Sequence, residues 1–269
     1  GRASVLFSAT LQPLPYYQKT LGGGDYSKRL TLESPFPQEN LGLFVANGVS
    51  TKYADRQNSL SAVADLLAAM SNSRPGNYIA YFPSYSYMQQ VWEAFTLGYP
   101  DIETTLQTSG MEEEAREAFI ARFAAATGGT LLGFCVMGGI FGEGVDLPGD
   151  QLVGTAIVGV GLPQMGPEPD AIRRYYDEEN GCGFEYAYQY PGMNKVMQAA
   201  GRVIRTDTDK GVVLLIDSRF ATPRYEEMFP RHWGHWQSTS LKALPAQLAG
   251  FWEGHVSIQD GRSAAEDGS

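Results

Sequence analysis

The chain has 269 residues and a formal net charge of −10, with 43% hydrophobic and 19% charged residues. This balance is typical of a globular protein with a sizeable core, and it excludes a disordered chain or a generally basic nucleic-acid coat. No apolar run reaches the roughly 18 to 20 residues that span a bilayer, and the N-terminal stretch lacks a secretion signal. The two cysteines form no CxxC pair. We therefore expect a cytoplasmic protein without membrane contacts or a metal site of its own.

Short apolar runs along the chain predict buried strands. Their residues are continuous rather than alternating, which is typical of parallel strands covered by helices on both faces. The runs are residues 4–8, 41–46, 78–82, 131–136, 152–159 and 212–217. Helical patterns lie between them, at residues 58–70, 86–95 and 111–126. This alternation predicts an α/β fold with a mainly parallel, doubly wound sheet over residues 1–255, followed by a disordered tail at 256–269.

Polar or glycine-rich segments follow four of the predicted strands. They are residues 8–10, 82–85, 138–146 and 217–220. Open α/β sheets bind ligands at the carboxyl ends of their strands, so we expect these segments to converge on one crevice. Glycine is retained where φ must be positive or where a ligand approaches the backbone, so "GGIFGEGVD" at 138–146 indicates a binding loop. For Asp217 and Arg219 the default interpretation is an internal salt bridge.

The stretch from Lys195 to Arg224 is locally basic, because it contains six basic and three acidic residues. If residues 194–205 form a helix, Gln198, Arg202 and Arg205 share one face. Two planar guanidinium groups beside an amide suit a phosphate, and Gly201 would allow its close approach. A solvated basic helix face explains the same spacing equally well. Spacing alone therefore leaves phosphate binding open.

The stretch "QAAGRVIRTDTDKGVVLLIDSRF" (198–220) resembles motif VI and the following strand of the XPD/DinG family of superfamily 2 DNA helicases. Three further segments resemble motifs of this family in the expected order: "LFSATLQPLPYYQKTLG" motif III, "GNYIAYFPSYSYM" motif IV and "GGIFGEGVDLPGD" motif V. Members of the family carry two RecA-like motor domains. The Walker A loop and D-E-x-H box of the first domain do not occur in this sequence. The resemblance therefore implies the second RecA-like domain, a parallel sheet sandwiched between helices.

The resemblance implies roles for the residues of motif VI. Arg202 and Arg205 match the arginines that reach across the domain cleft to the ATP phosphates and stabilise charge in the transition state. Gln198 matches the glutamine that lines this cleft and joins them as a catalytic candidate. Gly201 joins the candidate nucleotide-binding residues.

Motif V supplies the other candidate nucleotide-binding residues, which are Gly142, Glu143, Gly144 and Asp146. The preceding Gly138 and Gly139 would also let backbone amides approach a phosphate. Asp146 either orients a motif VI arginine or caps a helix.

Motifs III and IV are implied to act in coupling and in DNA binding. Ser8, Ala9 and Thr10 match motif III, which links hydrolysis to strand movement; the alternative is a simple turn at a strand end. Ser84 and Tyr85 match motif IV, near the path of the single strand, where a hydroxyl binds phosphate and a ring stacks on a base. For Tyr85, core packing is an equal alternative.

The function implied is the C-terminal motor domain of an ATP-dependent DNA helicase. Its partners would be single-stranded DNA, ATP and the first RecA-like domain, which holds most of the ATP with its Mg²⁺. An iron–sulfur cluster, where a parent protein has one, belongs to that first domain and not to this chain. We expect the isolated chain to be inactive as an ATPase. The alternative is a non-catalytic nucleic-acid or protein-binding module that retained the fold.

Two further segments carry weaker predictions. The tyrosine-rich residues 174–194 are expected to be irregular, either a DNA-facing loop or a local insertion. In "FPRHWGHWQ" (229–237), aromatic packing is favoured over a metal site because no third ligand can be assigned.

Overall fold

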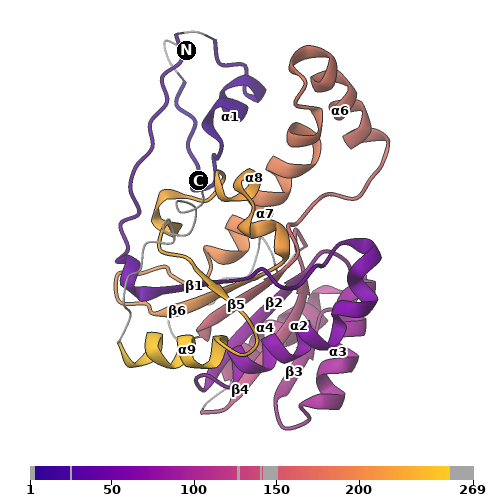
Figure 1. The fold of residues 1–269 in the computed structure, drawn as a ribbon, viewed down its shortest axis with the longest axis vertical. Coiled ribbons are helices and arrows are strands. Elements are labelled where there is room, and N and C mark those ends of the chain that lie inside the picture. Colours follow the sequence, from indigo (N-terminus) through magenta and orange to yellow (C-terminus); the bar gives the residue numbers. More distant parts are fainter. Residues whose placement is uncertain (1–3, 25, 126–127, 140, 142–150, 255–269) are drawn as a thin grey trace, which may run out of the picture.

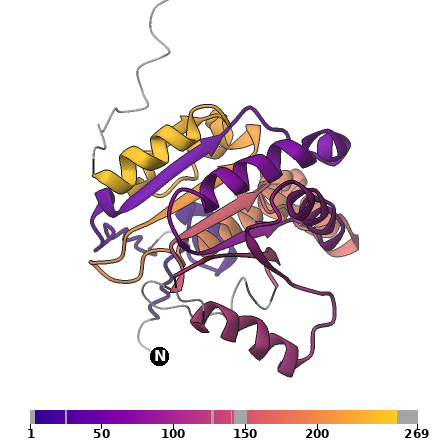
Figure 2. The same ribbon diagram turned by 90° about the horizontal axis from the view of Figure 1, so that it is seen from below.

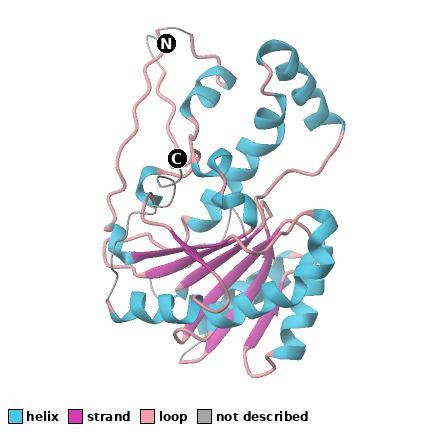
Figure 3. Ribbon diagram, in the orientation of Figure 1, coloured by secondary structure: helices cyan, strands magenta, loops and turns pink. Residues whose placement is uncertain are grey.

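A computed structural model describes residues 4–24, 26–125, 128–139, 141 and 151–254. Within these residues a seven-stranded sheet forms the centre of the molecule, with strand order β3-β4-β2-β5-β6-β1-β7 (Figures 1 and 3). Every neighbouring pair in it is parallel. The strands are β1 Leu41–Ala46, β2 Gly76–Phe82, β3 Glu103–Leu106, β4 Thr130–Val136, β5 Gly154–Val158, β6 Gly211–Ile216 and β7 Gln237–Thr239. The predicted parallel α/β fold is confirmed.

Helices cover both faces of the sheet (Figure 2). One face carries α2 Arg56–Ser71, α3 Tyr85–Gly98 and α9 Leu244–Glu253. The opposite face carries α4 Glu113–Ala125, α7 Tyr190–Ala200 and α8 Pro223–Glu226. Two more helices, α1 Leu14–Thr20 and α6 Pro167–Asn180, project beyond the sheet (Figure 1). Short 3-10 and π turns are Gln38–Asn40, Tyr53–Asp55, Glu185–Gln189, Ser218–Ala221 and Arg231–Trp233.

The central strands are apolar throughout because both of their faces are buried. In β1, Leu43 and Val45 join the core under α4 and α7, whereas Phe44 and Ala46 join the core under α2, α3 and α9. All of β5 and β6 are buried. Cys135 in β4 is fully buried, as expected of a small apolar side chain, and burial raises the pKa of its thiol. The two cores therefore explain the continuous apolar runs in the sequence.

The strand expected at residues 4–8 is absent, and this prediction was wrong. These residues have no regular secondary structure, and Val5 and Phe7 are 82% and 90% exposed. The segment lies in an extended N-terminal arm, residues 4–24 and 26–36, which also contains α1 (Figure 1). Conversely, β3 and β7 were not anticipated, because edge strands of composition ETTL and QST lack an apolar run.

Residues 174–194 are helical rather than irregular, so that expectation was also wrong. α6 continues to Asn180, and a π turn at Glu185–Gln189 leads directly into α7. Tyr186 and Tyr188 are buried here, whereas Tyr175 is exposed. The ring of Tyr16 in α1 lies 4.9 Å from that of Tyr186 and 5.0 Å from that of Tyr190. These contacts attach α1 to the helices beside it.

The tail predicted at 256–269 lies outside the described residues. In the part of the chain that the structure describes, no helix has both the length and the apolar character needed to cross a bilayer.

Candidate nucleotide and nucleic-acid interface

Three of the four polar segments expected at strand ends do follow strands of the sheet. Ser84 follows β2, Gly138 follows β4 and Asp217 follows β6. Because these strands are parallel, their carboxyl ends meet at one edge. The fourth segment, Ser8, Ala9 and Thr10, follows no strand and forms an exposed turn in which the Thr10 N–H donates to Ser8 Oγ at 3.3 Å. Gly142, Glu143, Gly144 and Asp146 lie outside the described residues.

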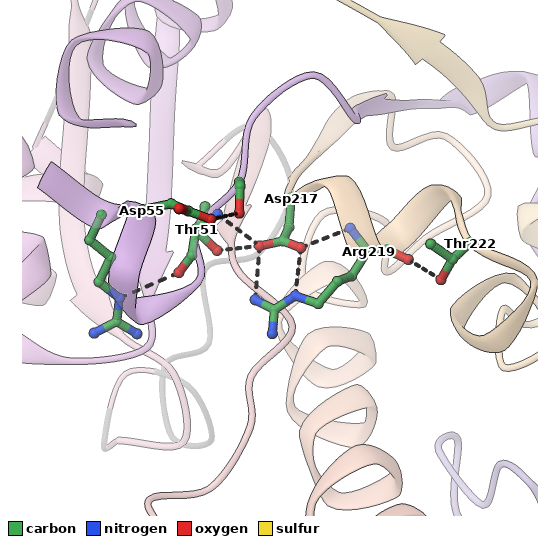
Figure 4. A network of polar contacts seen from close by, with 7 residues as sticks. Thr51, Asp55, Asp217, Arg219 and Thr222 are labelled. Atoms are coloured by element: carbon green, nitrogen blue, oxygen red, sulfur yellow. Dashed lines mark hydrogen bonds and ion pairs between the residues drawn. The ribbon is translucent and has the colours of Figure 1, made fainter. Parts of the chain in front are cut away.

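A buried carboxylate organises the end of β6 (Figure 4). Asp217 is fully buried and accepts Nε of Arg219 at 2.7 Å, Nη2 of Arg219 at 2.8 Å and the Arg219 backbone N–H at 2.8 Å. Thr51, in the loop after β1, donates both its backbone N–H, at 3.1 Å, and its hydroxyl to the same carboxylate. Burial alone would raise the pKa of Asp217, but these bonds outweigh it and hold the pKa below its usual value. The predicted internal salt bridge is confirmed.

A second guanidinium group, that of Arg56, lies next to this network. Its Nε donates to the Thr51 carbonyl at 3.4 Å and its Nη1 donates to Ser84 Oγ at 3.4 Å. It also lies over the rings of Tyr87, at 5.0 Å, and Tyr53, at 5.5 Å. Burial, and to a smaller extent the charge of Arg219, lowers the pKa of Arg56. Two cationic groups therefore lie close together at the carboxyl edge of the sheet.

Arg56 was missed in the sequence analysis, although the sequence carries one signal for it. It is the first residue of α2, where the helix dipole disfavours a cation. A cation in that position indicates that other groups determine its placement. Here those groups are Thr51, Ser84 and the two tyrosines.

The motif IV residues occupy the start of α3. Ser84 is its N-cap and accepts the Tyr87 backbone N–H at 3.4 Å. Tyr85 remains 37% exposed, so it is not a core residue. Its hydroxyl accepts a hydrogen bond of 3.0 Å from Nε2 of Gln107. The ring borders a pocket of about 300 Å³, also lined by Met88, Gln89 and Ser109.

The helix expected over residues 194–205 ends at Ala200, so Gln198, Arg202 and Arg205 do not share a helical face. Gln198 is exposed on α7, whereas Arg202 and Arg205 lie in the turn beyond it. Gly201 ends the helix, which is consistent with the low helix propensity of glycine. The expected geometry of motif VI was therefore wrong, although its residues remain close in sequence.

Two contacts draw the chain out of the helical path after Gly201. Val203 turns into the core, where it packs so closely on Gly211 that a Cβ at Gly211 would lie 2.3 Å from its side chain. The carboxylate of Asp209 accepts the backbone N–H groups of Arg205 and Thr206, each at 2.8 Å. Burial opposes the charge on Asp209, but these bonds prevail and lower its pKa.

Arg202 and Arg205 nevertheless act on the same part of the molecule. Burial raises the pKa of Tyr81 in β2. The positive charges of both arginines act in the opposite direction, but their effect is smaller. The Tyr81 hydroxyl donates to the carbonyl of Phe141 at 3.0 Å, on the segment that follows β4. Their charges thus act on a residue that contacts the beginning of the motif V segment, on the face of the sheet that α7 covers.

Lys195 adds a cation beside the same segment. Gly138 has a φ of 69°, and a Cβ there would lie 3.0 Å from the Lys195 side chain. This position therefore requires glycine for two reasons: the backbone is left-handed and α7 approaches it closely. In the sequence, Lys195 was only one member of the basic stretch; its contact with Gly138 emerges from the fold.

The histidine- and tryptophan-rich segment packs as an aromatic cluster, as the sequence predicted. Trp233 is buried, and its ring lies 5.3 Å from that of Phe229. His235 Nε2 lies 2.7 Å from the Leu41 carbonyl oxygen. Across the described ranges, no three His, Cys, Asp or Glu side chains are grouped so that they could hold a metal ion.

Comparisons with known proteins agree with this architecture. A family model described as "Helicase C-terminal domain" matches residues 67–236. The chain is 31% identical to the probable ATP-dependent helicase MJ0942 of Methanocaldococcus jannaschii, over 82% of this chain and 35% of that protein. It is 27% identical to the ATP-dependent helicase DinG of Mycobacterium tuberculosis, over 82% of this chain and 32% of the relative. It therefore spans about a third of the length of these relatives.

A solved XPD helicase structure supports the same fold. It aligns with a TM-score of 0.65 and 22% identity, covering 86% of this chain and 42% of the XPD chain. At this identity the likeness concerns the fold, and it agrees with the parallel sheet and its flanking helices. The family model, the relatives and the fold together lead to one assignment: the chain belongs to the XPD/DinG family of superfamily 2 helicases, as a helicase C-terminal domain.

Proposed function

We propose that this chain is the second motor domain of an ATP-dependent DNA helicase, and that it supplies Arg202 and Arg205 to ATP hydrolysis. The observation that supports the proposal is that the charges of both arginines act on Tyr81, whose hydroxyl donates to the Phe141 carbonyl at the start of the motif V segment. Lys195 lies against Gly138 in the same segment. Guanidinium groups bind phosphate oxygens with a planar pair of N–H donors, which suits the γ-phosphate of ATP. We further propose that Gln198, Gly201 and the motif V residues line this nucleotide cleft.

The chemistry of these side chains fits the phosphates of ATP rather than its Mg²⁺. Arg202, Arg205 and Lys195 are cations and cannot coordinate a metal ion. We therefore propose that the first RecA-like domain holds Mg²⁺ and most of the nucleotide. We propose that any iron–sulfur cluster belongs there too, because such a cluster is held by four cysteine ligands and this sequence has two cysteines, of which Cys135 is buried in the core.

We propose that the single DNA strand passes the start of α3. Ser84, Tyr85 and Arg56 supply a hydroxyl, a partly exposed ring and a cation within one small area. Such groups bind the phosphates and bases of a single strand without reading its sequence. The net charge of −10 makes binding by the isolated chain weak. Because phosphate contacts release counterions, this binding should also weaken as salt rises.

Steady-state ATP hydrolysis tests the motor role. The isolated chain should not hydrolyse ATP with or without single-stranded DNA, whereas the protein with both motor domains should be strongly stimulated by it. Hydrolysis by the isolated chain that survives removal of both arginines would contradict the proposal. A two-domain protein that binds DNA but never hydrolyses ATP would instead support the non-catalytic binding module.

Fluorescence anisotropy tests the DNA path. Single-stranded and duplex oligonucleotides are titrated with the isolated chain at two salt concentrations. We expect weak binding that prefers the single strand and decreases with salt. Tight binding to duplex that is independent of salt would contradict the proposed path.

A further inference from the structure

Gln107 is a buried polar residue that neither the motifs nor the family comparison assigns to a role. It follows β3 directly and is 3% exposed. Its Oε1 accepts the backbone N–H of Val136 at 2.8 Å, and its Nε2 donates to the hydroxyl of Tyr85 at 3.0 Å. One side chain thus connects the last residue of β4 with the first residue of α3.

The bond to Val136 has a structural explanation. β3 pairs with β4 only as far as Leu106 and Phe134, and the Gln107 backbone N–H donates once more to the Phe134 carbonyl at 2.9 Å. Beyond that point β3 offers no further carbonyl to β4. The side-chain oxygen of Gln107 instead accepts the Val136 N–H, which would otherwise be a partly buried donor without this partner.

The bond to Tyr85 has no such explanation. Tyr85 is partly exposed, so water could satisfy its hydroxyl at little cost. A buried amide that instead holds an exposed ring fixes the direction of that ring. The ring borders the pocket at the start of α3, and Gln107 lines the same pocket.

The same amide nitrogen of Gln107 also lies against the glycine-rich segment. A Cβ at Gly139 would lie 3.3 Å from Nε2 of Gln107, and the Gly139 N–H donates to the Val136 carbonyl at 3.3 Å. The Met137 N–H in turn donates to Phe82 at the end of β2, at 2.8 Å. A shift of the Tyr85 ring would therefore displace Gln107 and, through it, the backbone at the start of motif V.

We propose that Gln107 is a positioning residue that links a base-binding pocket at Tyr85 to the start of the glycine-rich segment. A base of the single strand enters the pocket and stacks on Tyr85. Gln107 holds the ring in place through its hydroxyl and couples the ring to Val136 and Gly139. This inference rests on the proposed function and adds the residue that joins the DNA contact to the nucleotide side of the domain.

The test uses the protein with both motor domains and compares Tyr85→Phe, Gln107→Leu and the double variant. Tyr85→Phe keeps the ring and the Val136 bond and removes only the link. The measurements are the DNA concentration that gives half-maximal ATPase stimulation and the maximal stimulated rate. We expect Tyr85→Phe to need about fivefold more DNA, the effect of one ordinary hydrogen bond, and to reach a lower maximal rate. Gln107→Leu also loses the Val136 bond, so its loss should be at least as large. The double variant should show no loss beyond that of Gln107→Leu, because one link cannot be removed twice.

Thr104→Val is the matched control. The indole N–H of Trp92 donates to Thr104 Oγ1 at 3.1 Å, so this bond joins the same two elements, α3 and β3, away from the pocket. Both values should stay native in this variant. Native values for Tyr85→Phe, multiplied losses in the double variant, or an equal loss in Thr104→Val would overturn the inference alone. A native protein without DNA-stimulated hydrolysis would overturn the proposed function and the inference with it.

Discussion

Two apolar segments of similar composition, "SVLFS" at 4–8 and "LGLFVA" at 41–46, have opposite fates in this molecule. The second forms β1, which pairs with β6 on one side and β7 on the other. Phe44 is 2% exposed and lies in the core. The first pairs with no strand of the described chain, and Phe7 is 90% exposed. An apolar run thus identifies a segment that is able to pair, whereas burial depends on whether a neighbouring strand is present.

The arm that carries the first segment is attached to the domain through α1, and further along the arm Glu33 forms an ion pair of 3.4 Å with Arg231. Helix α1 packs through Tyr16 on the tyrosines that precede and begin α7, and Lys19 forms an ion pair of 2.7 Å with Glu179. Exposed contiguous apolar residues in a soluble domain indicate a contact surface. We propose that residues 4–8 contact the first motor domain. The arm would then connect that domain with the helix that leads into motif VI.

The largest expected effect concerns the sheet region, where the proposed chemistry lies. In the two-domain protein, Arg202→Ala or Arg205→Ala should lower DNA-stimulated hydrolysis by roughly 10³ to 10⁵, the range measured for arginine fingers. Arg205→Lys keeps the charge but loses the planar pair of donors, so its activity should fall as well. The measurements are turnover and melting temperature. Near-normal turnover would show that both arginines are solvated surface residues, and a collapsed melting temperature would make their role structural.

The second prediction tests the buried segment itself. Phe44→Ala should lower the free energy of unfolding of the isolated chain by about 3 to 5 kcal/mol, because it removes a buried ring and leaves a cavity between the sheet and its helices. Urea denaturation followed by circular dichroism measures the change. A loss below about 1 kcal/mol would mean that β1 is not the buried strand that the structure describes.

The third prediction concerns the carboxylate at the end of β6. Asp217→Asn should destabilise the chain by about 2 to 3 kcal/mol, less than the roughly 3 to 5 typical of a broken buried pair. The reduction is expected because the Arg219 side chain is 21% exposed and can be hydrated. Thermal unfolding at pH 7 measures the difference. An unchanged melting temperature would show that the network of Figure 4 contributes little.

The same variant has a predicted pH dependence. The folded-state pKa of Asp217 is lowered, so the unfolded chain takes up the proton first as the pH falls. The stabilisation by the ionised carboxylate is therefore complete above the unfolded pKa of about 3.9 and is lost as the pH falls through the lower folded value. The gap in melting temperature between native chain and Asp217→Asn should be constant from pH 7 to 5 and narrow below about pH 4. A gap that widens at low pH would contradict this assignment.

The sequence predicted most of the sheet because its strands are buried on both faces. The runs 131–136 and 212–216 contain no polar residue that would obscure this pattern. This signal did not identify the edge strands β3 and β7, because edge strands are partly exposed and need no continuous apolar run. The helical character of 174–194 was missed because its tyrosines resemble a loop composition, whereas their rings pack against α1 from a distant part of the chain.

The candidate site was predictable where a residue type is tied to local geometry. Asp217 and Arg219 are two residues apart at a strand end, and their ion pair followed from that spacing. Gln107 was not predictable, because Tyr85 lies 22 residues away and the parallel strand order brings the two together. Arg56 carries only the local signal of a cation at the start of α2, and its contact with Ser84, 28 residues away, emerges from the fold. The prediction of a shared helical face in motif VI was wrong for a similar reason. The contact of Val203 with Gly211 outweighs continuation of the helix.

The smallest expected effect belongs to the exposed arm and completes the comparison. Phe7→Ala should leave the stability of the isolated chain within about 0.5 kcal/mol of the native value, because surface substitutions without buried partners rarely exceed this. Its counterpart at the buried Phe44 should cost roughly 3 to 5 kcal/mol, so two identical changes in similar runs differ only in their surroundings. In the two-domain protein, Phe7→Ala should lower the melting temperature, since the ring would be buried there against the first domain. Urea denaturation of the isolated chain and thermal unfolding of the two-domain protein measure these effects. A destabilised isolated chain would show that the arm already packs on this domain, and an unaffected two-domain protein would show that residues 4–8 do not contact the first motor domain.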